Sequence, residues 1–384
     1  MKTAITNGVI LTPFHKLTDY TLLIENGLII GIEDRVDTVA LQNFNVIDAK
    51  GCFVIPGLID LHAHGAYGAD TMDATFESLN RMSIFFACHG VTSFLPTTVT
   101  ASEKDTLRAI ENVSIYKSSV DGAQILGIHL EGPYLNEIFR GAQPQKHLRS
   151  ADPVEYEKWF PYQTVRLISV APEIEGVMEL IRRGREEKIE FAIGHSNASY
   201  EKVLEAVELG LRQVTHIFNG MPPLHHRSPG IVGAALSDHR LFTQVILDGI
   251  HVHPAVIKIL IASKGIDRVI AITDSIRASG LEDGEYTLGD QTVIVINGIA
   301  RTKEGGLAGS TLTLDQGLRN TLTFTDLSLQ EVLPMFTSVP AMALDLEFQK
   351  GCLRPSADAD IVLLDSNYSV RMSMVRGRMI LKAL

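Results

Sequence analysis

Hydrophobic residues form short, frequently interrupted runs at both ends of the chain. The N-terminal runs are broken by Asn-Gly, Gly and Asp in the segments AITNGVIL, TLLIENGLIIGIE and NVIDAKGCFVI. The C-terminal end has the same pattern in DADIVLLDSN, YSVRMSMVRG and RMILKAL. Short apolar runs bounded by turn residues are typical of β-strands. We therefore expect one small β-sandwich domain built from both termini, residues 1–55 plus 356–384, with Pro56-Gly57 as its N-terminal boundary.

Longer apolar runs alternate with amphipathic stretches in the middle of the chain, residues 56–355. The runs that we expect to be strands are GLIDLHAH, TSFLPT, ILGIHLEG, VRLISVAPE, EFAIGHSN, QVTHIFNG, FTQVILDG and VIAITDS. Stretches between them, such as IEGVMELIRRGREEK and SYEKVLEAVELG, have helical spacing. Such β–α units predict an α/β fold, and eight of them match a (β/α)8 TIM-like barrel. A doubly wound sheet is the alternative. The eight units, with polar residues gathered at the strand ends, favour the barrel over it.

Polar residues with metal-binding side chains stand at the ends of these predicted strands. His62 and His64 are two residues apart on one strand, so both point to the same face. Carboxylates and neutral imidazoles are ligands for Zn²⁺ or Fe²⁺, and a barrel gathers its catalytic groups at the C-terminal ends of its strands. We therefore expect one metal site formed by His62, His64, Glu131, His195, His216 and Asp274.

Composition narrows the function classes. The chain has 384 residues, of which 45% are hydrophobic, and a net charge of −11 from 34 basic and 45 acidic residues. An acidic chain of this kind argues against general binding to nucleic acid or to an anionic membrane, although it is compatible with a local phosphate pocket. Neither a convincing signal peptide nor a long apolar span is present, and the three cysteines are far apart. These features predict a cytoplasmic protein with reduced thiols.

The motifs around the polar residues resemble a known family. PGLIDLHAHG (56–65) is similar to the first-strand signature of the amidohydrolase superfamily. HLEGPYLN, GHSNA, THIFNGMPPLHHRSPG, DGIHVHP, TDSIRASG and GGLAGSTL together resemble the N-acetylglucosamine-6-phosphate deacetylase family, in the expected order over nearly the whole chain. HLEGP followed by THxxNxM and HHRxPG is the most specific part. The resemblance implies a metal-dependent hydrolase barrel that removes the acetyl group from N-acetylglucosamine 6-phosphate.

The resemblance also implies roles for the polar residues. Glu131, His195 and His216 would bind the principal metal, while His62 and His64 would bind a second one with Glu131 bridging. One or two divalent ions per chain are expected, of Zn, Fe, Mn or Co. The fourth strand, VRLISVAPE, has no lysine for carboxylation, which fits a bridging glutamate and argues against a dihydroorotase-like function. Asp274 would be the general base, taking a proton from water and returning it to the sugar nitrogen.

Further matches concern the small-molecule substrate. Arg227 and His251 resemble a phosphate-binding pair that, in this family, comes from the neighbouring subunit of a homodimer. Some relatives carry a histidine where this chain has Gln143, and a second metal would then take over its polarising role. The residues expected at the substrate are Ala142, Gln143, Asn219, Gly220, Arg227, His251 and Leu307.

Two alternatives to this function remain open at the level of sequence. The same machinery acts on the C4 epimer in N-acetylgalactosamine-6-phosphate deacetylases, and segments such as LPTTVTA and HVHP are similar to that subfamily too. A catalytically inactive barrel that serves as a binding scaffold is the second alternative. Inactive relatives usually lose metal ligands, and all six expected residues are present here.

Overall fold

A computed structural model describes residues 2–13, 15–36 and 38–383 of the chain. Eight parallel strands form a nearly closed barrel in which each pairs with the next along the chain. Between the last strand and the first, the Asp274 N–H donates to the His62 carbonyl at 2.9 Å. The eight predicted strands are confirmed, as β8 (Leu58–Ala63), β11 (Val91–Thr98), β13 (Ile128–Glu131), β14 (Val165–Val170), β15 (Glu190–Ile193), β16 (Gln213–Val214), β17 (Phe242–Ile246) and β18 (Val269–Ile272).

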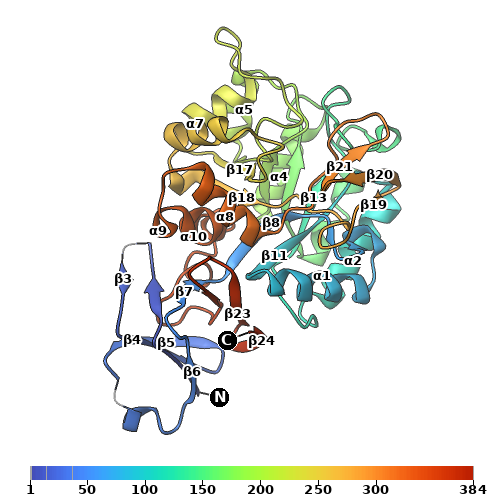
Figure 1. Ribbon diagram of the computed structural model, residues 1–384. Helices are drawn as coiled ribbons and strands as arrows, with labels where there is room; N and C mark the ends of the chain where they lie inside the picture. The colour runs from blue at the N-terminus through green and yellow to red at the C-terminus, as the bar shows by residue number, and fades with distance from the viewer. Residues whose placement is uncertain (1, 14, 37, 384) are drawn as a thin grey trace.

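Helices cover the outside of the barrel (Figure 1). Several begin with a side-chain cap; Thr75 accepts from the Ser78 N–H and Ser199 from the Lys202 N–H, which satisfies backbone donors that the first turn leaves unpaired. The helices are α1 (Phe76–Cys88), α2 (Glu103–Tyr116), α3 (Pro153–Tyr156), α4 (Val177–Glu186), α5 (Tyr200–Glu208), α6 (Gly230–Ser237), α7 (Pro254–Lys264), α8 (Leu314–Phe324), α9 (Leu329–Val332) and α10 (Ser338–Met342).

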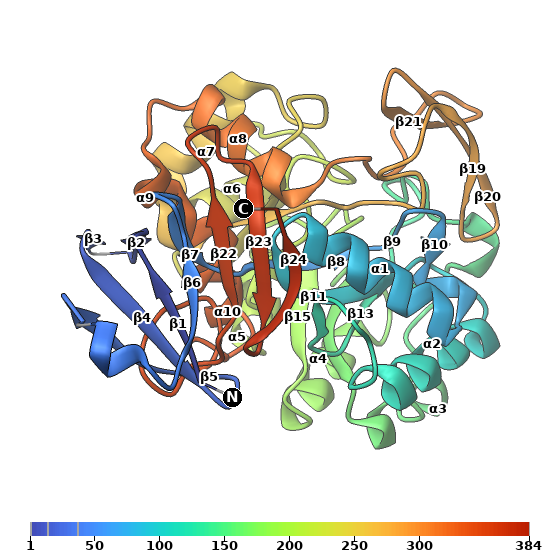
Figure 2. The same cartoon turned by 60° about the horizontal axis from the view of Figure 1, so that its bottom comes forward.

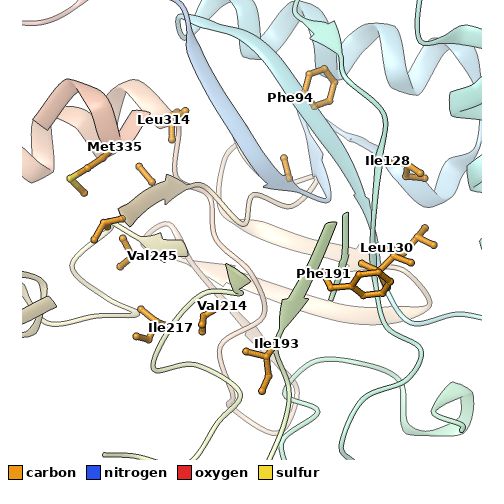
Figure 3. Packing of buried hydrophobic residues seen from close by; sticks show 14 of the residues in the cluster. Phe94, Ile128, Leu130, Phe191, Ile193, Val214, Ile217, Val245, Leu314 and Met335 are labelled. Atoms are coloured by element: carbon orange, nitrogen blue, oxygen red, sulfur yellow. The ribbon is translucent and has the colours of Figure 1, made fainter. Parts of the chain in front are cut away.

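Both faces of the barrel strands are buried. Leu130, Phe191 and Ile193 pack in the layer between strands and helices, where Figure 3 shows them close together. Leu61 and Leu167 belong instead to a second apolar cluster with residues of the facing strands. Burial on both faces explains why these strands appear in the sequence as continuous apolar runs rather than as an alternating pattern.

Strands from both termini form a second unit at one end of the molecule, where Figure 1 places the N- and C-termini. Its two sheets share a core that includes Ile5, Leu22 and Ile361, which confirms the expected β domain built from both ends. The boundaries at residues 55 and 356 stay a prediction. The sheets have the orders β5-β4-β1-β6 and β24-β23-β22-β7-β2-β3. Their strands are β1 (Lys2–Thr6), β2 (Val9–Leu11), β3 (Lys16–Leu17), β4 (Tyr20–Glu25), β5 (Leu28–Asp34), β6 (Asn45–Asp48), β7 (Phe53–Pro56), β22 (Ile361–Leu364), β23 (Val370–Val375) and β24 (Arg378–Lys382).

A small antiparallel sheet between β18 and α8 was not anticipated from the sequence. It packs on Val99 and Ile276 at the mouth of the barrel, and it consists of β19 (Gly284–Leu288), β20 (Gln291–Ile296) and β21 (Ile299–Thr302). The remaining short strands are β9 (Gly65–Ala66), β10 (Ala69–Asp70) and β12 (Gln124–Ile125). In the part of the chain that the structure describes, no helix has the length and apolar character needed to cross a membrane.

A buried lysine ties the barrel to the β domain. Lys350, 3% exposed, has its Nζ 2.6 Å from the Asp360 carboxylate, 2.8 Å from that of Asp358 and 2.6 Å from Gln124 Oε1 in β12. Removing one partner of a buried ion pair leaves the others uncompensated. This cluster therefore makes a measurable contribution to the stability of the folded chain.

We predict that Lys350→Met lowers the free energy of unfolding by about 3–5 kcal/mol, because it leaves buried carboxylates without their cation. Urea denaturation of the purified variant measures this change. Lys258→Met is the matched control, since Lys258 is 52% exposed and its ion pair with Asp326 is 3.3 Å long; its expected cost is about 0–1 kcal/mol. Equal losses in the two variants would show that the buried cluster has no special role.

Candidate active site

Six polar side chains meet where the barrel strands end. His62 lies near the end of β8 and His64 just after it, Glu131 is the last residue of β13, and the other three each follow their strand by two residues. All six are buried: His62, His64, Glu131, His195, His216 and Asp274. Their arrangement at the C-terminal ends of the strands is the one expected for the catalytic groups of a barrel enzyme.

Three of these residues have a left-handed backbone, which turns each side chain toward the barrel mouth. The φ angles are +47° at His195, +27° at His216 and +51° at Asp274. Such conformations cost about 1–3 kcal/mol for a residue other than glycine and persist only where the surroundings enforce them. Here neighbouring backbone groups do so, since the His195 carbonyl accepts from Asn136 at 2.8 Å and the Asp274 carbonyl from Ser310 at 2.8 Å.

The Glu131 carboxylate lies at the centre of the cluster. Its Oε1 is 3.1 Å from His195 Nε2, 3.0 Å from His216 Nε2 and 3.6 Å from His62 Nε2. Its Oε2 is 3.3 Å from His64 Nε2. One carboxylate thus faces four imidazoles, three at Oε1 and one at Oε2. These residues form two buried triads whose ligand atoms are close enough to share a metal ion.

Asp274 faces the same centre from β18. Its Oδ1 is 3.4 Å from His62 Nε2 and 3.2 Å from His64 Nε2. Burial alone would raise the pKa of Asp274, but His62 and His64 lower it to about 2. Burial likewise opposes ionisation of Glu131, yet His62 and His195 hold the pKa of that carboxyl well below its usual range. Both carboxylates are therefore ionised at neutral pH.

Two of the four imidazoles, those of His64 and His195, are oriented as metal ligands require. Nδ1 of His195 is 2.9 Å from the Phe139 carbonyl and Nδ1 of His64 is 3.2 Å from the Thr97 carbonyl. A ring that donates its Nδ1–H to a carbonyl presents the lone pair of Nε2 to the centre. The Nε2 atoms of His62 and His64 lie 3.2 Å apart.

The two buried carboxylates, Glu131 and Asp274, favour a positive charge at this centre. Burial lowers the pKa of His64, but the carboxylates of Asp274 and Glu131 raise it to about 10. A proton is thus strongly held where a divalent cation would otherwise balance the carboxylates. Histidine and carboxylate donors suit a first-row transition metal, so the residues present fit a binuclear metal site.

A cavity of about 730 Å³ opens beside this cluster. The expected substrate residues that line it are Ala142, Gln143, Asn219, Gly220, His251 and Leu307. His251 Nδ1 lies 2.6 Å from the Asp248 carboxylate. Burial opposes a charge on that ring, but Asp248 raises the pKa of His251, which favours a positive charge inside the cavity of its own chain.

Arg227 is the one expected substrate residue that does not line this cavity. It is exposed, and its Nη1 lies 2.9 Å from His226 Nε2 in the same loop. Within a single chain the structure therefore brings together every predicted site residue except Arg227. The sequence reasoning also missed Arg140, Thr302 and Lys303, which line the cavity. Arg140 adjoins the recognised Gly141-Ala142, whereas the other two belong to the unanticipated sheet and the turn that follows it.

The Gln143 side chain is directed at Glu131. It is 4% exposed; its Oε1 accepts from the Thr100 N–H at 2.7 Å, and its Nε2 donates to Glu131 Oε2 at 2.5 Å. The first bond fixes which end of the amide faces the carboxylate. Gln143 therefore fixes the orientation of the Glu131 carboxylate, with Oε2 facing Gln143 and His64 and Oε1 facing the other three imidazoles.

Comparisons with known proteins agree with this geometry. A model of the amidohydrolase family matches residues 53–380. The chain is 41% identical to N-acetylglucosamine-6-phosphate deacetylase of Vibrio furnissii, over 94% of this chain and 90% of that protein. It is 35% identical to N-acetylgalactosamine-6-phosphate deacetylase of Escherichia coli O157:H7, over 94% and 95%. A solved mutant of N-acetyl-D-glucosamine-6-phosphate deacetylase from Mycobacterium smegmatis, in complex with N-acetyl-D-glucosamine-6-phosphate, has a TM-score of 0.93 and 29% identity, over 99% of this chain and 100% of that one.

We predict that Gln143→Leu weakens the binding of Zn²⁺ to the metal-free chain about 10- to 100-fold, as is usual when a group that orients a metal ligand is lost. Competition with a chromophoric chelator measures the affinity. The control is Gln145→Leu, because Gln145 donates to the exposed Glu137 carboxylate, away from the cluster. Unchanged Zn²⁺ affinity in Gln143→Leu would mean that Glu131 needs no such support.

Proposed function

The chain belongs to the N-acetylglucosamine-6-phosphate deacetylase family of amidohydrolases, and we propose that it hydrolyses N-acetylglucosamine 6-phosphate to glucosamine 6-phosphate and acetate. The observation that carries the proposal is the buried cluster of four histidines and two carboxylates beside a cavity that is also lined by His251, whose pKa Asp248 raises. Amide hydrolysis requires an activated water, a polarised carbonyl and a proton donor for the amine. The cluster has groups for each of these requirements.

Two triads would hold the metal. Glu131, His195 and His216 form one site, and His62 with His64 forms the other, with Glu131 between them. A bound divalent cation supplies Lewis acidity to the acetamide carbonyl and to the attacking water. The protein's own contribution is to exclude solvent from the ligands, since every one of them is buried. We expect one or two divalent ions per chain, which elemental analysis of the purified protein counts and identifies.

Asp274 is the residue that moves the proton in this proposal. Its carboxylate is ionised, buried and faces the same centre as the four imidazoles. It accepts a proton from the attacking water and donates it to the sugar nitrogen as the carbon–nitrogen bond breaks. The product amine then leaves with that proton, while acetate keeps the oxygen of the water.

The remaining residues position the sugar phosphate. His251, whose pKa the Asp248 carboxylate raises, binds the phosphate from within the chain. Arg227 supplies a second phosphate contact from the partner in a homodimer, since it does not line the cavity of its own chain. The backbone at Ala142 and Gly220 and the amide of Asn219 bind the sugar. Leu307 packs on the acetyl methyl group.

We predict that kcat/KM is highest for N-acetylglucosamine 6-phosphate. The C4 epimer is the competing substrate, because a relative that acts on N-acetylgalactosamine 6-phosphate is 35% identical. A hydroxyl in the wrong position, facing groups that bind the correct one, lowers kcat/KM about tenfold or more. Removal of the phosphate eliminates charge-assisted hydrogen bonds and lowers kcat/KM at least about tenfold as well. Steady-state acetate release on the two 6-phosphates and their unphosphorylated sugars decides the substrate; a higher rate on the galacto epimer would reverse the assignment.

We predict that Asp274→Asn lowers kcat by about 10²–10⁴-fold with little change in KM, because the amide keeps the shape but carries no proton. The quantity to measure is kcat per bound metal at saturating substrate, which separates proton transfer from metal binding. If the variant keeps its metal and more than about a tenth of the wild-type kcat, Asp274 is not the proton carrier.

We predict that Arg227→Ala raises KM for the 6-phosphate at least about tenfold, the usual cost of a charge-assisted contact. If Arg227 acts across the dimer, mixing Arg227→Ala chains with Asp274→Asn chains restores activity. Each hybrid dimer then holds one intact site and one doubly defective site. Absence of any restoration, with hybrid dimers demonstrated by native mass spectrometry, would place Arg227 outside the partner's site.

A further inference from the structure

A second crevice, of about 600 Å³, lies between the barrel and the β domain. Its barrel side is formed by β12, by the start of β14 and by segments that follow α2 and α10; its other side is formed by the turns between β4 and β5 and between β23 and β24. Figure 2 shows β22, β23 and β24 side by side between the barrel helices and the N-terminal strands. The crevice shares no lining residue with the catalytic cavity. Its volume is that of a small-molecule site.

The two turns of the β domain are held close together. Gly27 has a φ of +83°, and a Cβ at this position would lie 2.7 Å from the Arg376 carbonyl oxygen. A larger residue would therefore push the turns apart. This contact brings Arg376 to the rim of the crevice, opposite the barrel residues that form its other wall.

Basic side chains from four separate segments line the crevice. They are Lys117, Arg166, Lys350, Arg376 and Arg378, whereas Asp358 is its one acidic lining residue among those described. Lys350 is already balanced by Asp358 and Asp360, at 2.8 and 2.6 Å. The remaining cations are therefore in excess over the carboxylates beside them, in a chain whose net charge is −11.

The partners of these remaining cations are weak or absent. Arg376 lies 3.7 Å from Asp358, and Arg378 lies 3.5 Å from Asp121. Among the described residues, neither Lys117 nor Arg166 has an ion pair. Arg166 donates from Nη2 to the Leu344 carbonyl at 2.9 Å, but its Nε is buried and has no hydrogen-bond partner. A buried guanidinium donor left unpaired costs free energy that an anionic acceptor would recover.

We propose that this crevice binds a small phosphate-bearing anion, at a site independent of the catalytic cavity. Guanidinium groups bind phosphate oxygens with paired, charge-assisted hydrogen bonds, and a concave site between low-dielectric walls concentrates the field of its cations. Arg166 contributes from the barrel, and Arg376 and Arg378 contribute from the β domain. A bound anion thus bridges the two units and stabilises their contact.

The test is a calorimetric titration of the metal-loaded protein with inorganic phosphate at constant ionic strength. We expect two binding events per chain in the wild type, one in each cavity. Arg166→Gln and Arg378→Gln should each weaken one event at least about tenfold and leave kcat/KM for deacetylation unchanged. The matched control is Arg108→Gln, because the Arg108 side chain is 51% exposed and that of Arg378 is 52% exposed.

The outcomes separate clearly. Phosphate binding that is the same in the wild type and in both crevice variants overturns the proposal, whether one event or two is seen, as does an equal loss in Arg108→Gln. Arg166 donates to the Leu344 carbonyl at 2.9 Å and Arg378 donates to the Val120 carbonyl at the longer distance of 3.3 Å. Because Arg378 has the weaker bond and a side chain that is 52% exposed, Arg378→Gln is the variant that keeps the test valid if Arg166→Gln folds poorly. The same titration with glucosamine 6-phosphate distinguishes free phosphate from a sugar phosphate as the preferred anion. Failure of the deacetylase assay would not bear on either result.

Discussion

The buried carboxylate of Glu131 is the constraint on which the site depends. Burying an ionised carboxylate is costly unless it is paired and hydrogen-bonded, and here four imidazoles and the Gln143 amide surround it. These partners come from strands far apart in the sequence, so only a barrel with the correct order and register brings them to one point. The fold and the site therefore both require the same strand order and register.

The barrel was predictable because its strands are buried on both faces and appear as continuous apolar runs. The polar residues that follow these runs were predictable as a group, since parallel strands deliver their C-terminal ends to one side. Their chemical roles stay predictions. The sheet β19–β21 was missed because the exposed residues of β20 that alternate with buried valines are themselves apolar, Ile294 and Ile296. In addition, the strand count of a barrel was already complete at β18.

Other features depend on contacts that no local pattern reveals. Gln143 was expected at the substrate, yet the direction of its amide is decided by the backbone N–H of Thr100, 43 residues earlier. Arg227 lies in a recognisable motif, but its target depends on where a second chain sits. The crevice between the barrel and the β domain assembles cations from four segments, none of which has a basic cluster of its own.

The residues with a left-handed backbone at the strand ends link the fold of the barrel to the geometry of the site. His195, His216 and Asp274 each adopt a backbone that a side chain disfavours, at the positions where the chain leaves the barrel. A strand that simply continued would carry these side chains past the centre, and a glycine that relieved the strain would remove the ligand. The chain keeps the strain because the cluster needs both the sharp turn and the side chain. The stability of the barrel core offsets that cost.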